Sequence, residues 1–290
     1  MRIIILGAGG RLGAALTREY REKFDVVAFD HAQLDLAKPE QIREKLSPLE
    51  FDLMINCAAF TNVDLCETEI DQAFAINAEA PQLLARICRD KKARLIHFST
   101  DYVFDGEKRE PYTETDVAKP ISVYGESKRT GEKLVLQTQD RHLIVRVSWV
   151  FGPDRPSFVD AMIKRAREQE YLDAVADKLS TPTYTHDIAQ ALPRFIDIDV
   201  PGGILHFSNS GECSWQEYAQ HALDCCISSG IQLRAKKVGA LELADMKNWV
   251  ARRPVYSVLS PAKYAQLTGV TPRSWRDAVA DYIERFYSKK

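Results

Sequence analysis

The stretch that decides the fold is Arg2-Ile3-Ile4-Ile5-Leu6-Gly7-Ala8-Gly9-Gly10-Arg11-Leu12-Gly13, at the start of the chain. Its first five residues form a short apolar run rich in β-branched side chains, which is typical of a buried parallel strand. Glycines at 7, 10 and 13 follow, and the apolar spacing from Leu12 to Leu16 predicts a helix. Glycines permit a tight turn close to a pyrophosphate, and the helix N-terminus supplies amide donors. This order predicts a dinucleotide site that includes Gly7, Gly9, Gly10, Arg11, Leu12 and Gly13.

The next apolar run, from Asp25 to Asp30, predicts a second strand that ends in an acid. Asp30 stands 17 residues after Gly13, near the spacing of a carboxylate that binds a cofactor ribose. Asp30 could instead cap the segment that follows. Arg11 could attract a 2′-phosphate, so the sequence leaves both NADPH and NADH open as the cofactor.

Strands alternate with helices through the first half of the chain, which favours a doubly wound α/β fold with a parallel sheet. Ligands of such sheets lie at the carboxyl ends of the strands. Gly7, Ala58, Thr100 and Trp149 each follow a predicted strand, so we expect one crevice to collect them. The further predicted strands are 52–56, 94–98 and 142–149, and the predicted helices are 39–47, 71–91 and 123–138.

After Trp149 the chain becomes turn-rich and then more helical. We expect residues 1–150 to form a Rossmann-type NAD(P)-binding domain and residues 151–290 to form mainly a smaller, mixed α/β substrate-binding region. Segments around 170–200 are expected to return to the first domain. The predicted elements here are helices at 157–168, 185–196, 215–226, 261–267 and 275–287, and strands at 171–176 and 203–207.

Tyr124 and Lys128 are four residues apart in a predicted helix, so their side chains share one face. A positive charge near a phenol lowers its pKa, which suits a proton donor to the alkoxide formed when a carbonyl is reduced. The hydroxyl of Thr100, at the end of a predicted strand, can hold that carbonyl oxygen. The pair alone is also compatible with an ordinary tyrosine and a solvated lysine.

Charge and cysteine usage exclude some classes of function. The formal net charge is −2, so no basic field favours nucleic acid or an anionic membrane. The six cysteines show no metal-ligand spacing, and we predict no metal site from them. With no secretion signal at the N-terminus, we expect a cytoplasmic protein.

Several motifs together resemble the extended short-chain dehydrogenases/reductases, and more closely the dTDP-4-dehydrorhamnose reductase family. The two most specific are Ser99-Thr100-Asp101-Tyr102-Val103-Phe104-Asp105-Gly106 and Arg146-Val147-Ser148-Trp149-Val150-Phe151-Gly152. The others are the glycine loop, residues 56–64, Tyr124-Gly125-Glu126-Ser127-Lys128, residues 181–184 and Arg253-Pro254.

The resemblance implies a role for each matched residue. Tyr124 would donate the proton, Lys128 would tune Tyr124 and hold the nicotinamide ribose, and Thr100 would replace the serine of many relatives. Asp35 and Leu36 match the adenine site, and Ala58, Ala59 and Thr61 match the cofactor wall. The substrate-binding positions are Val63, Thr100, Asp101, Tyr102, Trp149 and Arg253. The basic pair Arg252-Arg253 could bind a diphosphate, although a solvated surface position is the commoner arrangement for such a pair.

The resemblance implies reduction of the C4 keto group of dTDP-4-dehydro-L-rhamnose by NADPH or NADH. It also implies a homodimer, with Mg²⁺ in some members, although no acidic ligands map onto this chain. The alternatives are another 4-keto nucleotide-sugar reductase or epimerase, and a non-catalytic NADP-binding regulatory subunit like that of methionine adenosyltransferase.

Overall fold

The computed structural model describes residues 1–196 and 201–288. Its centre is a parallel six-stranded sheet with strand order β10-β5-β4-β3-β1-β2. The strands are β1 (Arg2–Leu6), β2 (Asp25–Phe29), β3 (Leu53–Asn56), β4 (Arg94–Thr100), β5 (Leu143–Val147) and β10 (Gly203–His206). The order reverses between β1 and β3, which is the topology of a doubly wound sheet and confirms the predicted fold class.

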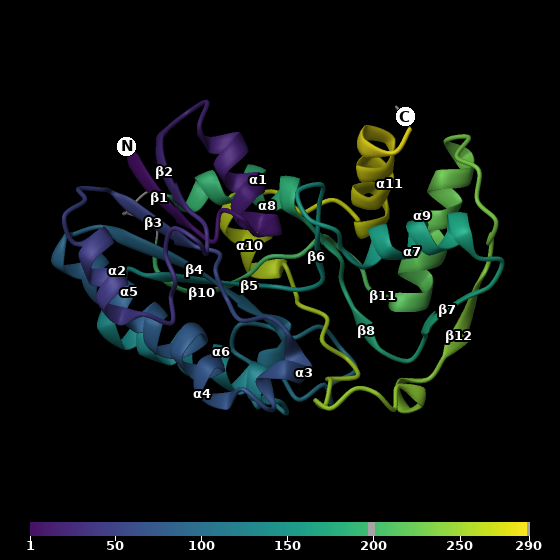
Figure 1. Cartoon of the computed structure of the whole chain (residues 1–290), viewed down its shortest axis with the longest axis horizontal. Coiled ribbons are helices and arrows are strands. Elements are labelled where there is room, and N and C mark those ends of the chain that lie inside the picture. Colours follow the sequence, from purple (N-terminus) through teal and green to yellow (C-terminus); the bar gives the residue numbers. More distant parts are fainter. Residues whose placement is uncertain (197–200, 289–290) are drawn as a thin grey trace.

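Apolar side chains on both sides of each strand explain why this sheet is buried on two faces. In β1, Ile3 and Ile5 join one apolar core while Ile4 and Leu6 join another, because successive side chains point to opposite faces. The first core includes residues of α1 (Arg11–Tyr20), α8 (Thr185–Ala191) and α10 (Ala262–Thr268). The second includes residues of α2 (Pro39–Leu46), α5 (Ala80–Asp90) and α6 (Val123–Thr138), and Figure 1 shows these layers around the sheet.

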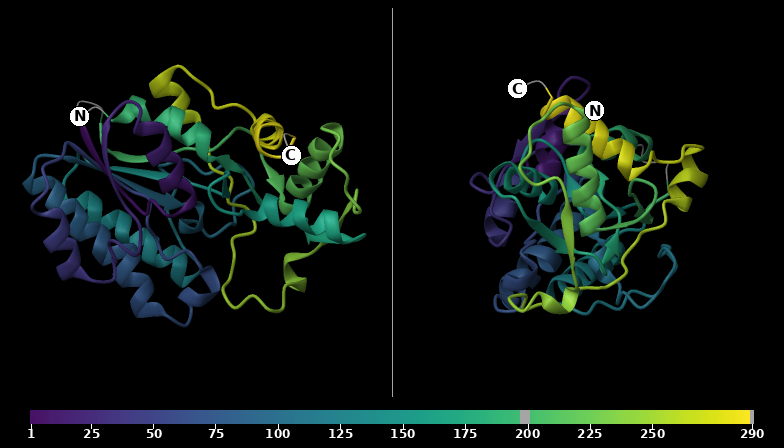
Figure 2. Two further views of the ribbon diagram at one scale, coloured as in Figure 1. Left: turned by 45° about the horizontal axis from the view of Figure 1, so that its top comes forward. Right: turned by 90° about the vertical axis from the view of Figure 1, so that its right-hand side faces the viewer.

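A second group of elements, drawn on the right of Figure 1, has an apolar core of its own. It contains the parallel pair β7 (Leu172–Val175) and β12 (Val238–Leu241). Three helices pack around this pair: α7 (Phe158–Glu168), α9 (Trp215–Ser228) and α11 (Trp275–Phe286). The left view in Figure 2 also shows this group beside the central sheet.

Two segments from the second half of the chain lie with the central sheet. Strand β10 pairs in parallel with β5, and α8 packs beside α1. The segment β7, by contrast, pairs with β12 rather than with the sheet. Short strand pairs connect the two groups: β6 (Val150–Phe151) with β9 (Thr183–Tyr184), and β8 (Leu179–Ser180) with β11 (Cys213–Ser214).

The predicted continuous helix 71–91 is wrong in one respect. The structure divides it into α4 (Ile70–Phe74), a π-helical turn (Ala75–Glu79) and α5. Within that turn Asn77 accepts a hydrogen bond from the Phe60 amide at 2.8 Å and donates to Ser127 Oγ at 3.1 Å. Such π-turns re-aim a side chain within a helix, and this one ties the loop after β3 to helix α6.

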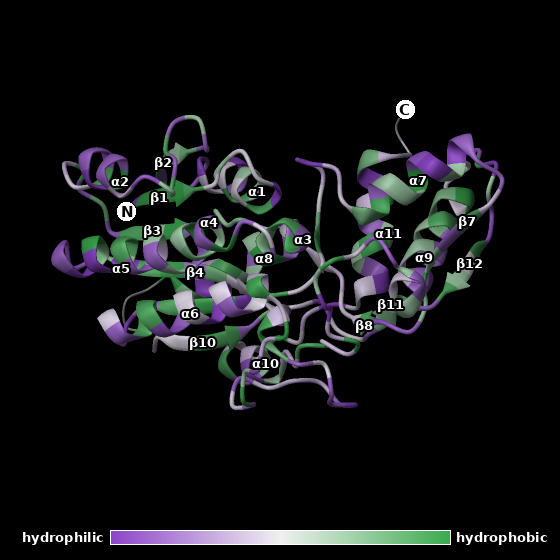
Figure 3. Ribbon diagram, turned by 60° about the horizontal axis from the view of Figure 1, so that its bottom comes forward, coloured by the Kyte–Doolittle hydropathy of each residue, from purple (hydrophilic) through white to green (hydrophobic). Residues whose placement is uncertain are grey.

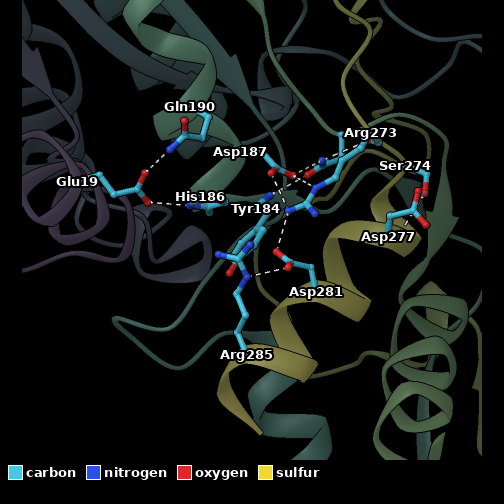
Figure 4. A network of polar contacts seen from close by, with 11 residues as sticks. Glu19, Tyr184, His186, Asp187, Gln190, Arg273, Ser274, Asp277, Asp281 and Arg285 are labelled. Atoms are coloured by element: carbon cyan, nitrogen blue, oxygen red, sulfur yellow. Dashed lines mark hydrogen bonds and ion pairs between the residues drawn. The ribbon is translucent and has the colours of Figure 1, made fainter. Parts of the chain in front are cut away.

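Figure 4 shows a polar network that links the layers. Glu19 of α1 contacts His186 and Gln190 of α8 at 3.0 and 2.9 Å. Arg273 pairs with Asp187 of α8 and Asp281 of α11, at 2.8 and 3.0 Å. Arg273 therefore connects the sheet-side helix α8 to the second group of helices.

Hydropathy follows the same layering. Figure 3 shows hydrophobic strands in the middle of the sheet and mixed helices outside them. Among the described residues, no helix combines the length and apolar character that crossing a membrane requires.

Candidate functional site

The glycine loop follows β1, and two of its glycines, Gly7 and Gly13, lie too close to other backbone atoms to carry a side chain. A Cβ on Gly13 would lie 2.2 Å from the Gly7 carbonyl oxygen, and one on Gly7 (φ +76°) would lie 2.7 Å from the Ala58 amide. Helix α1 starts after Gly10 without a side-chain cap or an acidic residue in its first turn. The helix N-terminus therefore keeps its amide donors and positive dipole end for an anion. This cradle fits the pyrophosphate of a dinucleotide.

We expect Gly13→Ala to weaken or abolish nicotinamide binding. A Cβ at 2.2 Å from a backbone oxygen must push α1 away from the loop. Gly202→Ala is the matched control, because its Cβ would lie 2.0 Å from the Asp140 carbonyl oxygen, an equal clash before β10 and outside the cofactor site. Fluorescence titration with NADPH should show a much larger loss for Gly13→Ala. Equal affinities in the two folded variants would contradict this role of the loop.

Asp30 and Arg11, the two residues expected to select between NADH and NADPH, both lie close to the glycine loop. The Asp30 carboxylate accepts a hydrogen bond from the Gln33 amide at 2.9 Å, so Asp30 also caps the following turn. The Arg11 guanidinium donates to the carbonyls of Val150 and Arg155 at 3.0 and 3.1 Å. These contacts leave the expected 2′-phosphate role of Arg11 without support. Arg155, which the sequence analysis did not single out, donates to the Gly9 carbonyl at 2.6 Å.

The remaining predicted cofactor positions lie near the ends of β2 and β3. Asp35 accepts a hydrogen bond from the Ala37 amide at 3.0 Å, and Leu36 is buried in the core on one face of the sheet. The Ala58 amide donates to Asn56 Oδ1 at 3.0 Å. Ala59 is half-buried beside it and Thr61 is exposed.

Thr100 and Tyr124 come together at the carboxyl end of β4. Tyr124 lies in the first turn of α6, whose N-terminus is capped by the Ser122 hydroxyl. It packs edge-on against Tyr102 with ring centroids 5.6 Å apart. Tyr102 and Tyr124 belong to a small apolar cluster that Val63 also contacts. The cluster thus joins predicted catalytic and substrate-binding positions.

The pKa of Tyr124 is raised, whereas the sequence predicted that the nearby Lys128 would lower it. Burial raises it, a hydrogen bond with Thr100 opposes the rise, and Lys128 does not contribute. Lys128 is 1 % exposed and donates to the Phe98 carbonyl at 2.7 Å, with His97 Nε2 3.2 Å away. Burial lowers the pKa of Lys128 to about 8. The sequence predicted a shared helix face correctly but could not predict that desolvation outweighs the attraction between the two groups.

Asp101 lies beside Thr100 in a polar pocket of hydroxyl groups. Its carboxylate accepts hydrogen bonds from Thr100, Ser180 and Ser257 at 3.0, 3.1 and 2.5 Å. Burial nevertheless raises the pKa of Asp101. Hydroxyl donors from three separate segments therefore fix the start of the Asp101–Val103 turn, which carries Tyr102.

Trp149 and Lys178 lie next to this turn. Trp149 has φ +40°, a conformation that is strained for any residue except glycine. The Lys178 ammonium is fully buried, lies 5.3 Å from the Tyr102 ring centre and 5.4 Å from the Trp149 ring centre, and has no hydrogen-bond partner within the described chain. Burial lowers the pKa of Lys178 to about 8.

Arg253 is held in place rather than solvated. Its guanidinium binds both oxygens of Asp64 at 3.0 and 2.7 Å and stacks 3.9 Å from the centre of the Trp249 ring. Asp64 also accepts hydrogen bonds from the amides of Val250 and Ala251 at 2.9 Å. The segment before Arg253 is therefore anchored to α3 (Val63–Cys66), next to Val63.

Sequence reasoning missed Asp64 and Lys178 as site residues. Asp64 is the last residue of the 56–64 motif, and its separation from Arg253 by 189 residues hid the pairing. Lys178 lies in a polar stretch, Asp177-Lys178-Leu179-Ser180, where a solvated lysine is the ordinary expectation.

Metal binding has little support. Within residues 1–196 and 201–288, no group of three or more His, Cys, Asp or Glu side chains could hold an ion. The Mg²⁺ implied for some relatives therefore has no identified ligands in the described chain.

Comparison with known proteins assigns the family. Residues 1–288 match the family model described as the RmlD substrate binding domain. The chain belongs to this family. It is 34% identical to dTDP-4-dehydrorhamnose reductase of Aggregatibacter actinomycetemcomitans, over 96% of this chain and 97% of that one. A probable dTDP-4,6-dihydroxy-2-methyloxan-3-one 4-ketoreductase of Streptomyces antibioticus is 38% identical, over 97% and 94% of the two chains.

The fold of this RmlD family member agrees with a solved relative. The crystal structure of dTDP-4-dehydrorhamnose reductase from Bacillus anthracis, in complex with NADP, superposes with a TM-score of 0.90. The two sequences are 32% identical, and the match covers 98% of this chain and 99% of the other. The resemblance drawn from the motifs is therefore confirmed.

Proposed function

We propose that the chain uses NADPH or NADH to reduce the C4 keto group of dTDP-4-dehydro-L-rhamnose to dTDP-L-rhamnose, for cell-surface polysaccharide biosynthesis. The observation that carries this proposal is the meeting of Thr100 and Tyr124 at the sheet edge that also holds the glycine loop. Membership of the RmlD family supports the choice of sugar.

Each group then has one task. The nicotinamide supplies the hydride to the carbonyl carbon. The Thr100 hydroxyl holds the carbonyl oxygen, and the Tyr124 phenol protonates that oxygen as negative charge develops on it. Lys128 binds the ribose hydroxyls. Holding the ketone against both groups supplies much of the rate through positioning.

The substrate is bound by residues on both sides of the site. Val63, Tyr102 and Trp149 present apolar and aromatic surface to the deoxysugar, and Asp101 fixes the turn that carries Tyr102. Arg253, pre-positioned by Asp64, suits the diphosphate because its planar guanidinium can bind two oxygens at once. Ala58, Ala59 and Thr61 line the cofactor, and Asp30, Asp35 and Leu36 lie toward its adenosine end.

Cofactor preference, location and assembly belong to the same proposal. Asp30 beside Gly9 suits a free ribose, whereas Arg155 on the Gly9 carbonyl offers a positive charge for a 2′-phosphate. Use of both cofactors follows from this pair. We also propose a cytoplasmic homodimer in which residues 1–150 bind the cofactor and residues 151–290 mainly bind the sugar nucleotide.

A different 4-keto sugar is the first alternative. The 38% identity to the Streptomyces antibioticus ketoreductase supports it, and equals the identity to the dTDP-4-dehydrorhamnose reductase of Mycobacterium tuberculosis. A non-catalytic NADP-binding subunit is the second, although the retained Thr100, Tyr124 and Lys128 argue for turnover.

A turnover assay tests the proposal. The purified chain is mixed with NADPH or NADH and a panel of 4-keto nucleotide sugars, and the reduced-nicotinamide absorbance is followed. We expect the highest kcat/KM with dTDP-4-dehydro-L-rhamnose. Faster turnover of another sugar would support the first alternative, and nicotinamide binding without turnover of any sugar would support the regulatory role.

A further inference from the structure

Four hydrogen bonds run in series from the cofactor wall to Lys128. The Ala58 amide meets Asn56 Oδ1 at 3.0 Å, and Asn56 Nδ2 meets His97 Nδ1 at 3.0 Å. His97 Nε2 lies 3.2 Å from Lys128 Nζ, which lies 2.7 Å from the Phe98 carbonyl oxygen. Asn56, His97 and Lys128 are each at most 1 % exposed, so water cannot substitute for a partner in this series.

The direction of the series follows from its first donor. A backbone amide can only donate, so the atom of Asn56 that faces Ala58 is the carbonyl oxygen and the atom that faces His97 is the NH₂ group. His97 Nδ1 must then accept. A neutral imidazole carries one proton, so that proton is on Nε2 and points toward Lys128. Burial keeps the pKa of His97 well below its usual value, so the ring is neutral.

Only a neutral lysine can accept from His97. An ammonium has three donors and no lone pair, whereas an amine can accept from His97 Nε2 and still donate to the Phe98 carbonyl. The neutral amine therefore satisfies all four contacts, and the ammonium leaves two donors face to face.

Other charged or titratable groups around Lys128 also influence its preference for the neutral amine. The Glu132 carboxylate, one helical turn further along α6, favours the ammonium, but Arg146 and Arg129 neutralise it at 2.7 and 2.9 Å. Burial raises the pKa of the Cys57 thiol well above its usual value, so the thiol carries no charge near neutral pH. The Tyr124 phenol is likewise neutral.

We propose that Asn56 and His97 favour the neutral amine of Lys128 in the cofactor-free protein, so that at alkaline pH binding of the nicotinamide cofactor charges Lys128 with one proton from solvent. This inference rests on the proposed nicotinamide site. The ribose hydroxyls supply oxygen acceptors, and the charged lysine turns from His97 toward them. His97 and Asn56 are thus positioning residues that act through Lys128.

The direction of the pH dependence follows from linkage. Burial places the pKa of Lys128 at about 8 in the free protein, and binding raises it toward the ordinary value near 10.5. NADPH affinity should therefore be constant below about pH 8 and fall by about tenfold per pH unit above it, until the pKa of the bound form is reached. Binding should take up a proton between these two pKa values.

Isothermal titration with NADPH at pH 9, in buffers of different ionisation enthalpy, counts the protons. At this pH the 2′-phosphate is fully ionised and adds none. We expect uptake that approaches one proton per site in the wild type and none in Lys128→Met. Asn56→Asp replaces the NH₂ donor by an acceptor oxygen, which reverses the series and makes His97 Nε2 an acceptor for an ammonium. Uptake should therefore disappear in Asn56→Asp. If Asn56→Asp does not fold, nitrogen NMR of the free wild type should still show the proton of the neutral His97 ring on Nε2.

Each result of the titration and of the NMR measurement either supports or overturns the inference about Lys128. Uptake in the wild type that disappears in Asn56→Asp supports the inference, as does a proton on His97 Nε2 in the free wild type. An absence of proton uptake by a wild type that binds NADPH overturns it, as does wild-type uptake in a folded Asn56→Asp protein or a proton on His97 Nδ1 in the free wild type. Failure of the wild type to bind NADPH or NADH overturns the proposed function itself, and the inference with it.

Discussion

Tyr124→Phe should lower kcat by about 10²–10⁴-fold, the usual contribution of a positioned general acid. The substitution removes one hydroxyl and keeps the ring that packs against Tyr102. Cofactor affinity should therefore stay close to the wild-type value, while kcat and kcat/KM fall together, as expected when an interaction exists only in the transition state. Stopped-flow or steady-state absorbance with the preferred keto-sugar measures the loss.

A matched control separates this effect from a general loss of tyrosine hydroxyls. Tyr112→Phe removes another buried hydroxyl, which donates to Asp105 at 2.8 Å outside the site. It should lower stability and leave kcat nearly unchanged. Near-full turnover by Tyr124→Phe would mean that another group protonates the alkoxide. The effect of Lys128→Met should not add to that of Tyr124→Phe, because the ammonium that Lys128 carries in the cofactor-bound enzyme acts partly through the phenol.

The first strands of the central sheet could be predicted because the sequence patterns that specify them are local. The apolar run Arg2–Leu6 and the glycines that follow it specify a strand and a turn without reference to the rest of the chain. The predicted strands at 25–30 and 52–56 agree with β2 and β3 to within one residue at each end. Tyr124 and Lys128 share a helix face because their spacing equals one helical turn.

Features that depend on distant partners were not predictable. The π-helical turn at Ala75–Glu79 places Asn77 on Phe60 and Ser127, and apolar spacing cannot distinguish this turn from an α-helix. The Asp64–Arg253 pair joins opposite ends of the sequence. The polarity of the Asn56–His97–Lys128 series depends on which atoms face one another, which no spacing rule encodes.

The second large effect is expected at Arg146 and Glu132, a buried pair behind the catalytic helix. Arg146 of β5 binds both carboxylate oxygens of Glu132 at 2.7 Å, and the two side chains are at most 1 % exposed. Glu132 follows Lys128 and Tyr124 by one and two turns of α6. The pair therefore fixes the rotation and height of the helix that carries the proton donor over the end of β4.

Arg146→Met should destabilise the protein by about 3–5 kcal/mol, because a buried carboxylate loses its main partner. In the wild type Arg146 lowers the pKa of Glu132 against the effect of burial, so this stabilisation is present above the unfolded pKa and is lost as the pH falls through the folded one. In the variant, burial raises that pKa, so the deficit should be large at pH 7 and smaller at pH 5. Urea unfolding at both pH values measures it.

The double variant Glu132→Gln/Arg146→Met removes the unpaired charge and should recover much of the stability at pH 7. A deficit that is the same at both pH values and is not reduced in the double variant would mean that Arg146 stabilises by packing against the Phe104 ring, 5.1 Å away, rather than by its charge.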